Sequence, residues 1–361
     1  MTRALGRDEL RALAEAGEVI SEARIVGLDL SGLDLSGVIF DRVHIEGCRA
    51  AELDLRESIF DRCTFSEVDL GGARLSLAAL SRCALRSASL SGADLTDLKA
   101  DSCAFEDVAL DGATLVRTIF ARSRIAGVDG SGARVDRLVF MECELENVSL
   151  ASTHLAQLVA MDADFSTVDL TDAILDNCAL IGVRLAGRDL SRMRLSRTNF
   201  TRADLSGAIL REAELAQCNF MFAKLDGAEL DGAKAERALF IDASLGSASL
   251  RSAILDGALF VRADCRGADF SAARMPQAIL TDARCLAAIF TSANLREADL
   301  SRAELDGSDF TGANLYRARL HRVREESARF DEGRALALGT DEERARAEEF
   351  VPVIPGEEVR R

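Results

Sequence analysis

A large apolar residue closes every block of five along most of this chain. Between Thr201 and Leu230 the blocks read TRADL, SGAIL, REAEL, AQCNF, MFAKL and DGAEL, with Ala or Cys two places before each closing residue. The same frame runs from Ile25 to Leu320 without insertion or deletion, and its closing residue is Leu or Phe in most blocks. Any fold for this chain must therefore give every fifth residue equivalent surroundings.

A repeat of five residues excludes a continuous helix and a continuous strand. On an α-helix five residues turn the chain by about 500°, so successive closing residues would spread around the axis. On a flat strand the odd spacing would send them alternately to opposite faces. A chain that bends once per block can bury all of them, because each corner resets the inward direction. The outward positions are mainly Asp, Glu, Arg, Ser and Gly, and glycine suits the corners because it tolerates unusual dihedral angles.

The phenylalanines indicate the length of one coil. Phe200, Phe220, Phe240 and Phe260 are twenty residues apart, and Phe40, Phe60, Phe120 and Phe140 share their phase, as Cys63, Cys83, Cys103 and Cys143 share another. Like residues at this spacing are expected to stack on successive coils, so one coil holds four blocks. About fifteen coils at roughly 4.8 Å between strands predict a rod of about 70 Å.

The blocks GADLT, RADLS, GAELD, SANLR, EADLS and GANLY closely resemble the A(D/N)LXX signature of the pentapeptide-repeat family. The resemblance covers roughly residues 21–330. It implies an all-β fold, a right-handed quadrilateral parallel β-helix whose axis is filled by the closing residue and the small residue of each block. Handedness and a four-sided section come from the resemblance and not from the periodicity.

Three segments are expected along the chain. Residues 1–20 contain RDELRALAEA at 7–16, which predicts a short helix that caps the open N-terminal end of the β-helix at 21–330. In residues 331–361 we expect a short helix that begins with a capping box of Thr340 and Glu343, then an extended FVPVIP and a loose charged terminus. In some family members a C-terminal helix mediates dimerisation, so a homodimer is one alternative.

Composition restricts the partners and the compartment. The formal net charge of −16 disfavours direct nucleic-acid binding through a basic surface. No apolar run reaches the length of a membrane span, and residues 1–20 lack an apolar signal core. We therefore expect a cytoplasmic protein that does not bind membranes.

Catalysis, a metal site and a cofactor are not expected. All nine cysteines fall at inward positions, seven at the small site and two as closing residues, which is how a small apolar residue is used. The three histidines are His44, His154 and His321, which lie too far apart to converge with a nucleophile. There is no glycine-rich phosphate loop before a helix.

Two residues break the rules of the repeat. Gly130 stands where a large closing residue belongs, which predicts a gap in the core beside a flexible corner. Arg188 stands at an inward small position, so its charge must leave through a distorted coil or find a partner inside. A tolerated defect is the first interpretation of both, and a functional loop is the alternative.

Sorting outward residues by their phase in the twenty-residue period predicts one acidic face. Only Arg49, Arg86 and Arg266 oppose its acids. The acidic face is a solvated surface or a docking strip for a basic partner that imitates DNA phosphates. Its members are Asp29, Glu46, Glu67, Asp69, Glu106, Asp107, Asp129, Glu146, Asp169, Asp189, Asp226, Glu229, Asp269, Asp306 and Asp309.

A second set of outward residues is apolar and flanks the main phenylalanine column. This apolar ridge is either a surface for a protein partner or self-association, or a set of side chains that fold over a corner and cover each other. Its members are Val139, Met141, Val159, Met161, Ile181, Met221, Phe222, Leu239, Ile241, Leu259 and Val261.

Two functional hypotheses follow. The first is a non-enzymatic scaffold that binds a protein partner through its rod faces, and IVGLDLSGLDLSG after the N-terminal helix loosely resembles repeat proteins found beside bacterial type VI secretion components. The alternative is a DNA mimic that protects or inhibits gyrase, a type II topoisomerase, as some family members do. The acidic face favours the mimic. The absence of inserted loops from the repeat frame counts against it.

Overall fold

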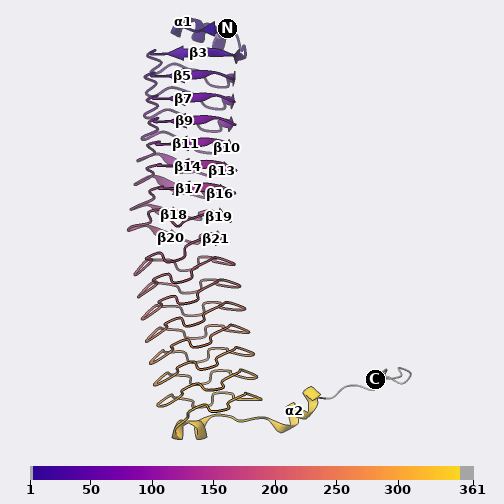
Figure 1. Ribbon diagram of the computed structural model, residues 1–361. Coiled ribbons are helices and arrows are strands. Elements are labelled where there is room, and N and C mark those ends of the chain that lie inside the picture. The colour runs from indigo at the N-terminus through magenta and orange to yellow at the C-terminus, as the bar shows by residue number, and fades with distance from the viewer. Residues whose placement is uncertain (1–2, 350–361) are drawn as a thin grey trace, which may run out of the picture.

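The computed structural model describes residues 3–349, so the FVPVIP segment and the charged terminus lie outside the described residues. The chain winds into a straight stack of similar coils, with α1 (Arg7–Glu15) at one end and α2 (Glu342–Glu349) at the other (Figure 1). The β-helix occupies the segment between these two helices, and a short strand that precedes α1 adds to its first sheet.

Within the described residues the strands form three parallel sheets, one strand per coil in each sheet. The first has the order β1-β3-β5-β7-β9-β11-β14-β17, with β1 (Arg3–Ala4), β3 (Ala23–Val26), β5 (His44–Glu46), β7 (Thr64–Ser66), β9 (Ala84–Arg86), β11 (Ala104–Glu106), β14 (Arg124–Ala126) and β17 (Glu144–Glu146). The second contains β2 (Ile20–Ser21), β4 (Ile39–Asp41), β6 (Ile59–Asp61), β8 (Ala79–Ser81), β10 (Lys99–Asp101), β13 (Ile119–Ala121), β16 (Val139–Met141), β19 (Val159–Met161) and β21 (Ala179–Ile181). The third contains β12 (Thr114–Val116), β15 (Arg134–Asp136), β18 (His154–Ala156) and β20 (Ile174–Asp176).

The predicted twenty-residue coil is confirmed by the strand register. Phe40 pairs with Phe60 in adjacent parallel strands, and isolated bridges continue the same offset as far as Asp309 and Arg329. The rings of Phe220 and Phe240 stack with their centroids 5.0 Å apart and their planes 7° apart. A ladder of hydrogen bonds between neighbouring coils accompanies these stacks, so the ladder and the ring stacks stabilise the same register.

The predicted inward positions form one continuous core. Every closing residue from Ile25 to Leu320 is buried, as is nearly every small residue two places before it. Leu28, Arg188 and Met193 are the small-site residues of this frame that stay partly exposed. Side chains therefore fill the axis of the rod.

The corners explain the other letters of the repeat. Two residues after the closing position the backbone takes a positive φ, 63° at Gly207 and 60° at Arg202, which costs a non-glycine residue some strain. The Asp or Asn before the closing residue steadies the corner by accepting a hydrogen bond from the backbone N–H two residues on. Asp204 accepts in this way from Ser206 at 3.1 Å and Asn219 from Met221 at 3.0 Å.

Both ends of the β-helix are capped. The helix expected at 7–16 is α1, where Leu10 is buried and Arg7 donates to the backbone carbonyl of Asp29 at 2.6 Å. The expected capping box at the C-terminal helix was wrong. Asp341, and not Thr340, caps α2 by accepting from the N–H groups of residues 343 and 344, because the Thr340 hydroxyl is engaged with the N–H of Arg322. A short 3-10 helix, η1 (Glu332–Leu336), follows the last coil.

The two halves of the rod have different coils. Coils before residue 182 contain three-residue strands, whereas the described coils after it make only one bridged residue per face. The inward small site is varied in the first half, with Val38, Leu53 and Cys63, and it is Ala at nearly every block from Ala203 to Ala318. We infer that this site selects the coil geometry, since alanine lets the backbone approach the axis more closely.

Candidate interaction surfaces

The residues of the acidic face lie in the expected columns, but many of them are paired within the rod. Bridges join Asp29 to Arg49 and Arg49 to Asp69, so these residues stack along one side. Arginines from this side and from the adjoining columns make ion pairs with acids of the set: Arg24 with Glu46, Arg49 with Asp29, Arg86 and Arg124 with Glu106, Arg124 with Glu146, Arg211 with Glu229, Arg251 with Asp269, Arg324 with Asp306 and Arg329 with Asp309. Counting charges from the sequence missed most of these arginines, because the count included only the columns of the acidic face.

Other acids of this face have a structural role at the corners. Asp129, Asp169 and Asp189 each accept a hydrogen bond from the N–H of residue 131, 171 or 191 at 2.9 to 3.0 Å. Hydrogen bonds from Ser131, Thr171 and Ser191 hold the pKa of these three carboxyl groups below its usual value. Asp69 caps its own corner similarly, and Asp226 accepts from Ser244 and from the N–H of Gly246. Glu67 and Asp107 lie in the same set of columns, and no ion pair joins either to another described residue.

The residues of the apolar ridge lie in adjacent columns on one face, as expected. Val139 pairs with Val159, Met141 with Met161, and Met161 with Ile181 in β16, β19 and β21, while a bridge joins Leu239 to Leu259. Phe222 is 52% exposed and Met141 39%, and Met161 is exposed too. The remaining members are half-buried: Val139, Val159, Ile181, Met221, Leu239, Ile241, Leu259 and Val261.

The structure extends the apolar ridge in both directions. Ile39, Ile59, Ile119 and Ile279 occupy the column of Val139, and Ile59 is 45% exposed. The sequence reasoning missed them although the same twenty-residue phase identifies them. Lys99 interrupts the column between Ile59 and Ile119, and Asn199, Thr201 and Asn219 interrupt the ridge near its centre, so the extended ridge consists of three apolar stretches on one face.

The predicted core gap at Gly130 is confirmed. An enclosed cavity of about 20 Å³ is lined only by apolar side chains and Gly130, among them Phe120 and Phe140. The rings of these two phenylalanines are 5.7 Å apart and tilted by 20°, so the core is looser here than in the second half.

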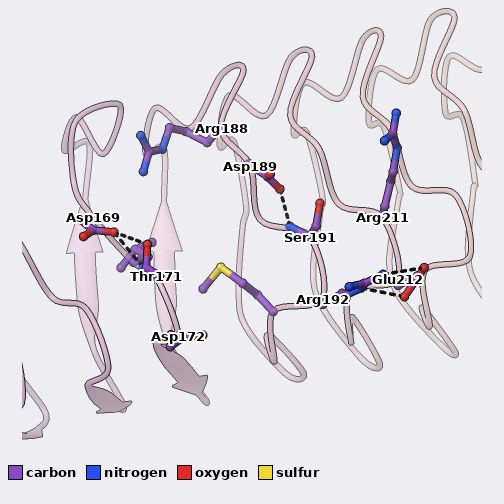
Figure 2. A pocket seen from close by; sticks show the side chains of 11 residues that line it. Asp169, Thr171, Asp172, Arg188, Asp189, Ser191, Arg192, Arg211 and Glu212 are labelled. Atoms are coloured by element: carbon purple, nitrogen blue, oxygen red, sulfur yellow. Dashed lines mark hydrogen bonds and ion pairs between the residues drawn. The ribbon is translucent and has the colours of Figure 1, made fainter.

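Arg188 leaves the core between two coils, as the sequence required. Its guanidinium donates to the backbone carbonyls of Ser166 at 3.1 Å and Val168 at 2.7 Å, while its buried Nε has no partner among the described residues. Figure 2 shows this side chain turned toward the coil that carries Asp169. Met193, at the next inward small position, is likewise only partly buried.

The corner at Thr167 is irregular for a related reason. Thr167 stands at the corner position where the backbone usually takes a positive φ, as it does at the equivalent Asn147 and Gly187. The φ of Thr167 itself is not positive. A β-branched residue is disfavoured there. The Thr167 hydroxyl accepts from the N–H of Asn147 at 3.1 Å, in place of the backbone carbonyl of Ser166 that would accept this bond in a regular coil. The carbonyl of Ser166 is thereby left for Arg188.

The backbone ladder is broken beside these two residues. Elsewhere in this column the N–H of Leu150 donates to the carbonyl of Asp169 at 2.9 Å, and that of Leu190 to Ile209 at 2.7 Å. The corresponding bond from Leu170 to Asp189 is not made, and the column of bridges stops at Asp169 and resumes at Asp189. We call this place the ladder break. A surface hollow of about 650 Å³ opens over it (Figure 2).

The cysteines of residues 3–349 lie inside the rod, and the three histidines lie on separate coils. The cysteines are buried, and burial raises the pKa of the Cys178 and Cys218 thiols to about 12. His44 bonds Thr64 at 2.7 Å, and His321 contacts Glu348 at 3.3 Å. Among the described residues no group of three or more His, Cys, Asp or Glu side chains is arranged to hold a metal ion. No helix in this part of the chain is long and apolar enough to cross a membrane.

Comparison with known families identifies the class of protein. A family model described as a pentapeptide repeat region matches residues 38–115. A second, described as pentapeptide repeats (8 copies), matches residues 178–217, 218–257, 248–284, 258–291 and 288–324. Together the matches cover more than half of the chain, which therefore belongs to the pentapeptide-repeat family and has its right-handed quadrilateral β-helix. Residues 116–177, between the matched regions, contain Gly130 and Thr167.

Solved structures match this chain at low identity and low TM-score. A trypsin-treated QnrB1 variant, a plasmid-mediated fluoroquinolone resistance protein, is 17% identical over 59% of this chain and 90% of its own, with a TM-score of 0.28. HetL, a pentapeptide repeat protein involved in heterocyst differentiation regulation in the cyanobacterium Nostoc, is 22% identical over 87% of this chain and 96% of its own, with a TM-score of 0.19. No curated protein matches the chain. The family assignment rests on the matched repeats and not on these structures.

Proposed function

We propose that this pentapeptide-repeat protein is a non-enzymatic scaffold that binds another protein through its apolar ridge. The observation that carries the proposal is the stacking of outward apolar residues on one face, where Phe222 is about half exposed and Met141 and Met161 are exposed over more than a third of their surface. From Val139 to Leu259 the ridge spans about 30 Å at roughly 4.8 Å per coil, in two apolar stretches separated at Asn199, Thr201 and Asn219. The two stretches lose contact with water when a partner with apolar side chains covers them.

The test replaces Met161, Met221 and Phe222 by Ser. These side chains point outward, so the rod should stay folded while partner binding falls at least tenfold. The matched control replaces Ile209 and Ile289 by Ser, since they are outward apolar residues in a column on the opposite side of the rod. Sedimentation of the purified chain measures self-association, and quantitative co-purification from the cells that make it measures a different partner. Equal behaviour of the ridge variant, the control and the wild type in both measurements would refute the proposal.

The DNA mimic remains the second candidate because several acids of the acidic face lack a cationic partner. Asp129, Asp169 and Asp189 are three of them, yet each caps a corner with one carboxylate oxygen. Eight of the fifteen acids of this face are paired with arginines, so it imitates a row of phosphates poorly. A gyrase supercoiling assay separates the candidates, because protection from a fluoroquinolone that is lost when Glu67 and Asp107 become Gln and Asn would favour the mimic.

An accessory role in a bacterial secretion system has weaker support. It rests on the resemblance of the N-terminal helix and the repeats that follow it. In the rod, α1 covers the open end of the β-helix and Arg7 bonds to the first coils, which accounts for the helix without a secretion partner. The apolar ridge and not the N-terminal cap is therefore the surface to test first.

A further inference from the structure

The ladder break leaves backbone groups unpaired on two facing coils. Within the described residues the N–H groups of Leu170, Asp172 and Asp189 make no hydrogen bond, and neither do the carbonyls of Asp189 and Ser191. The carbonyl of Val168, which would normally accept from Asp189, is occupied by Arg188. Groups of this kind at a sheet edge pair readily with an added strand.

The unpaired groups lie at the matching corners of two neighbouring coils. One wall offers the N–H groups of Leu170 and Asp172, on either side of the turn residue Thr171, and the other offers the carbonyls of Asp189 and Ser191 at the corresponding corner. A strand presents its carbonyls and N–H groups toward one neighbour at alternate residues. An extended segment that bends at this corner, as the coils themselves do, can therefore accept from the first wall and donate to the second.

The lining of the hollow carries four acids and three arginines, a small acidic excess that favours a cationic segment. Arg192 pairs with Glu212 at 2.9 Å and Arg211 pairs with Glu229, while Arg188 keeps its charge and donates to two backbone carbonyls. The carboxylates of Asp172, Asp169 and Asp189 line the same hollow, and no ion pair joins any of them to another described residue.

The adjoining face carries a similar opening. The column that contains β17 makes no bridge between Glu144 and Asp164, although Asp164 is bridged to Arg184. A second hollow of about 530 Å³ lies there, lined by Glu142, Glu144 and Asp162 among others. Arg184 is the cation in its lining, and it is paired with Asp164 at 2.8 Å.

From these observations we propose that the ladder break binds an extended, lysine- or arginine-bearing peptide segment, which adds to the open backbone ladder between the coils of Asp169 and Asp189 (Figure 2). The inference does not rest on the apolar ridge. It names a second binding site on another face of the rod.

The test repairs the ladder with residues that the repeat itself uses. Thr167→Gly restores the usual corner residue, as at Gly187 and Gly207, and Arg188→Ala restores the usual inward residue, as at Ala208. The matched control is Ser247→Gly with Ser308→Ala, which makes the corresponding changes at a regular corner and a regular inward site. The probe is acetyl-tetralysine amide at low salt, and spermine is a comparison with the same charge but no peptide groups.

We expect the repaired variant to bind tetralysine at least fivefold more weakly than the wild type and the control, with spermine binding unchanged or stronger. Simple charge attraction predicts the opposite for tetralysine, because the repair removes a positive charge. Equal or tighter tetralysine binding by the repaired variant would overturn the proposal. Hydrogen exchange on the wild type gives an independent readout, since bound tetralysine should slow exchange at Leu170, and an unchanged rate would also overturn it.

Discussion

The two halves of the rod share one sequence frame but not one coil geometry. In the first half the inward small site varies among Val, Leu, Cys, Thr and Ala, and the faces carry strands up to β21. In the second half the site is almost always Ala, the faces are reduced to single bridges, and closing residues such as Leu205 and Leu250 are fully buried. The halves therefore differ in the small inward residue and share the large closing residue, so we expect the small residue to set how closely each coil packs.

The junction between the halves is where the rod is imperfect. Thr167, Arg188 and Met193 lie within two coils of the end of β21, and the last strands and the first alanine-lined coils meet there. The predictions below test whether the halves differ in packing as described.

The largest expected effect is the loss of a stacked ring. Phe240→Ala should lower the free energy of unfolding by about 3–5 kcal/mol, because both neighbouring rings in its column lose contact and the alanine-lined coils have little room to relax. Phe140→Ala should cost less, since Phe140 already borders the cavity at Gly130 and its ring stack is looser. Urea unfolding of the two variants measures the difference. A larger loss for Phe140→Ala would reverse the comparison.

A smaller effect is expected at the inward small site. Ala228→Val should destabilise the rod by about 1–3 kcal/mol through overpacking, because the same column continues as alanine in Ala208 and Ala248. Ala88→Val should cost under about 1 kcal/mol, since Val68 and Val108 occupy the adjoining coils of that column. Thermal unfolding of both variants provides the measurement. If the two substitutions cost the same, the small site does not distinguish the halves.

The smallest expected effect is a pH dependence of stability that both halves share. Hydrogen bonds from Ser131 and Thr171 lower the pKa of Asp129 and Asp169 in the first half, and one from Thr311 lowers that of Asp309 in the second. A carboxyl group whose pKa is lowered in the folded state stabilises the fold at pH values above its unfolded pKa near 4. This stabilisation is lost as the pH falls through the pKa of the folded state. Urea midpoints should therefore drop between pH 5 and pH 3. Asp309→Asn should reduce the drop modestly, as should Asp129→Asn, because amides still cap the corner but do not titrate. A drop unchanged in both variants would show that these caps do not contribute.

Most of the fold could be predicted from the sequence because the repeat is local and unbroken. The closing residues, the small sites and the columns of Phe220 and Phe240 all follow from counting residues, and Arg188 was identified because it breaks the count. The ladder break could not be predicted from the sequence. It depends on the Thr167 hydroxyl replacing the Ser166 carbonyl as an acceptor, which leaves that carbonyl to accept from Arg188, twenty-one residues beyond Thr167. The ion pairs of the acidic face were missed because they join residues on adjoining columns, such as Arg124 and Glu146, and a count by face separates them.

Amide hydrogen exchange resolved by residue tests the central claim most directly, namely that one continuous ladder of twenty-residue coils is interrupted beside Arg188. The account predicts slow exchange at Leu150, Leu190 and Leu210, whose N–H groups donate to the next coil, and fast exchange at Leu170 and Asp189 between them. Protection at Leu170 equal to that at Leu150 and Leu190 would contradict it, because the ladder would then be unbroken.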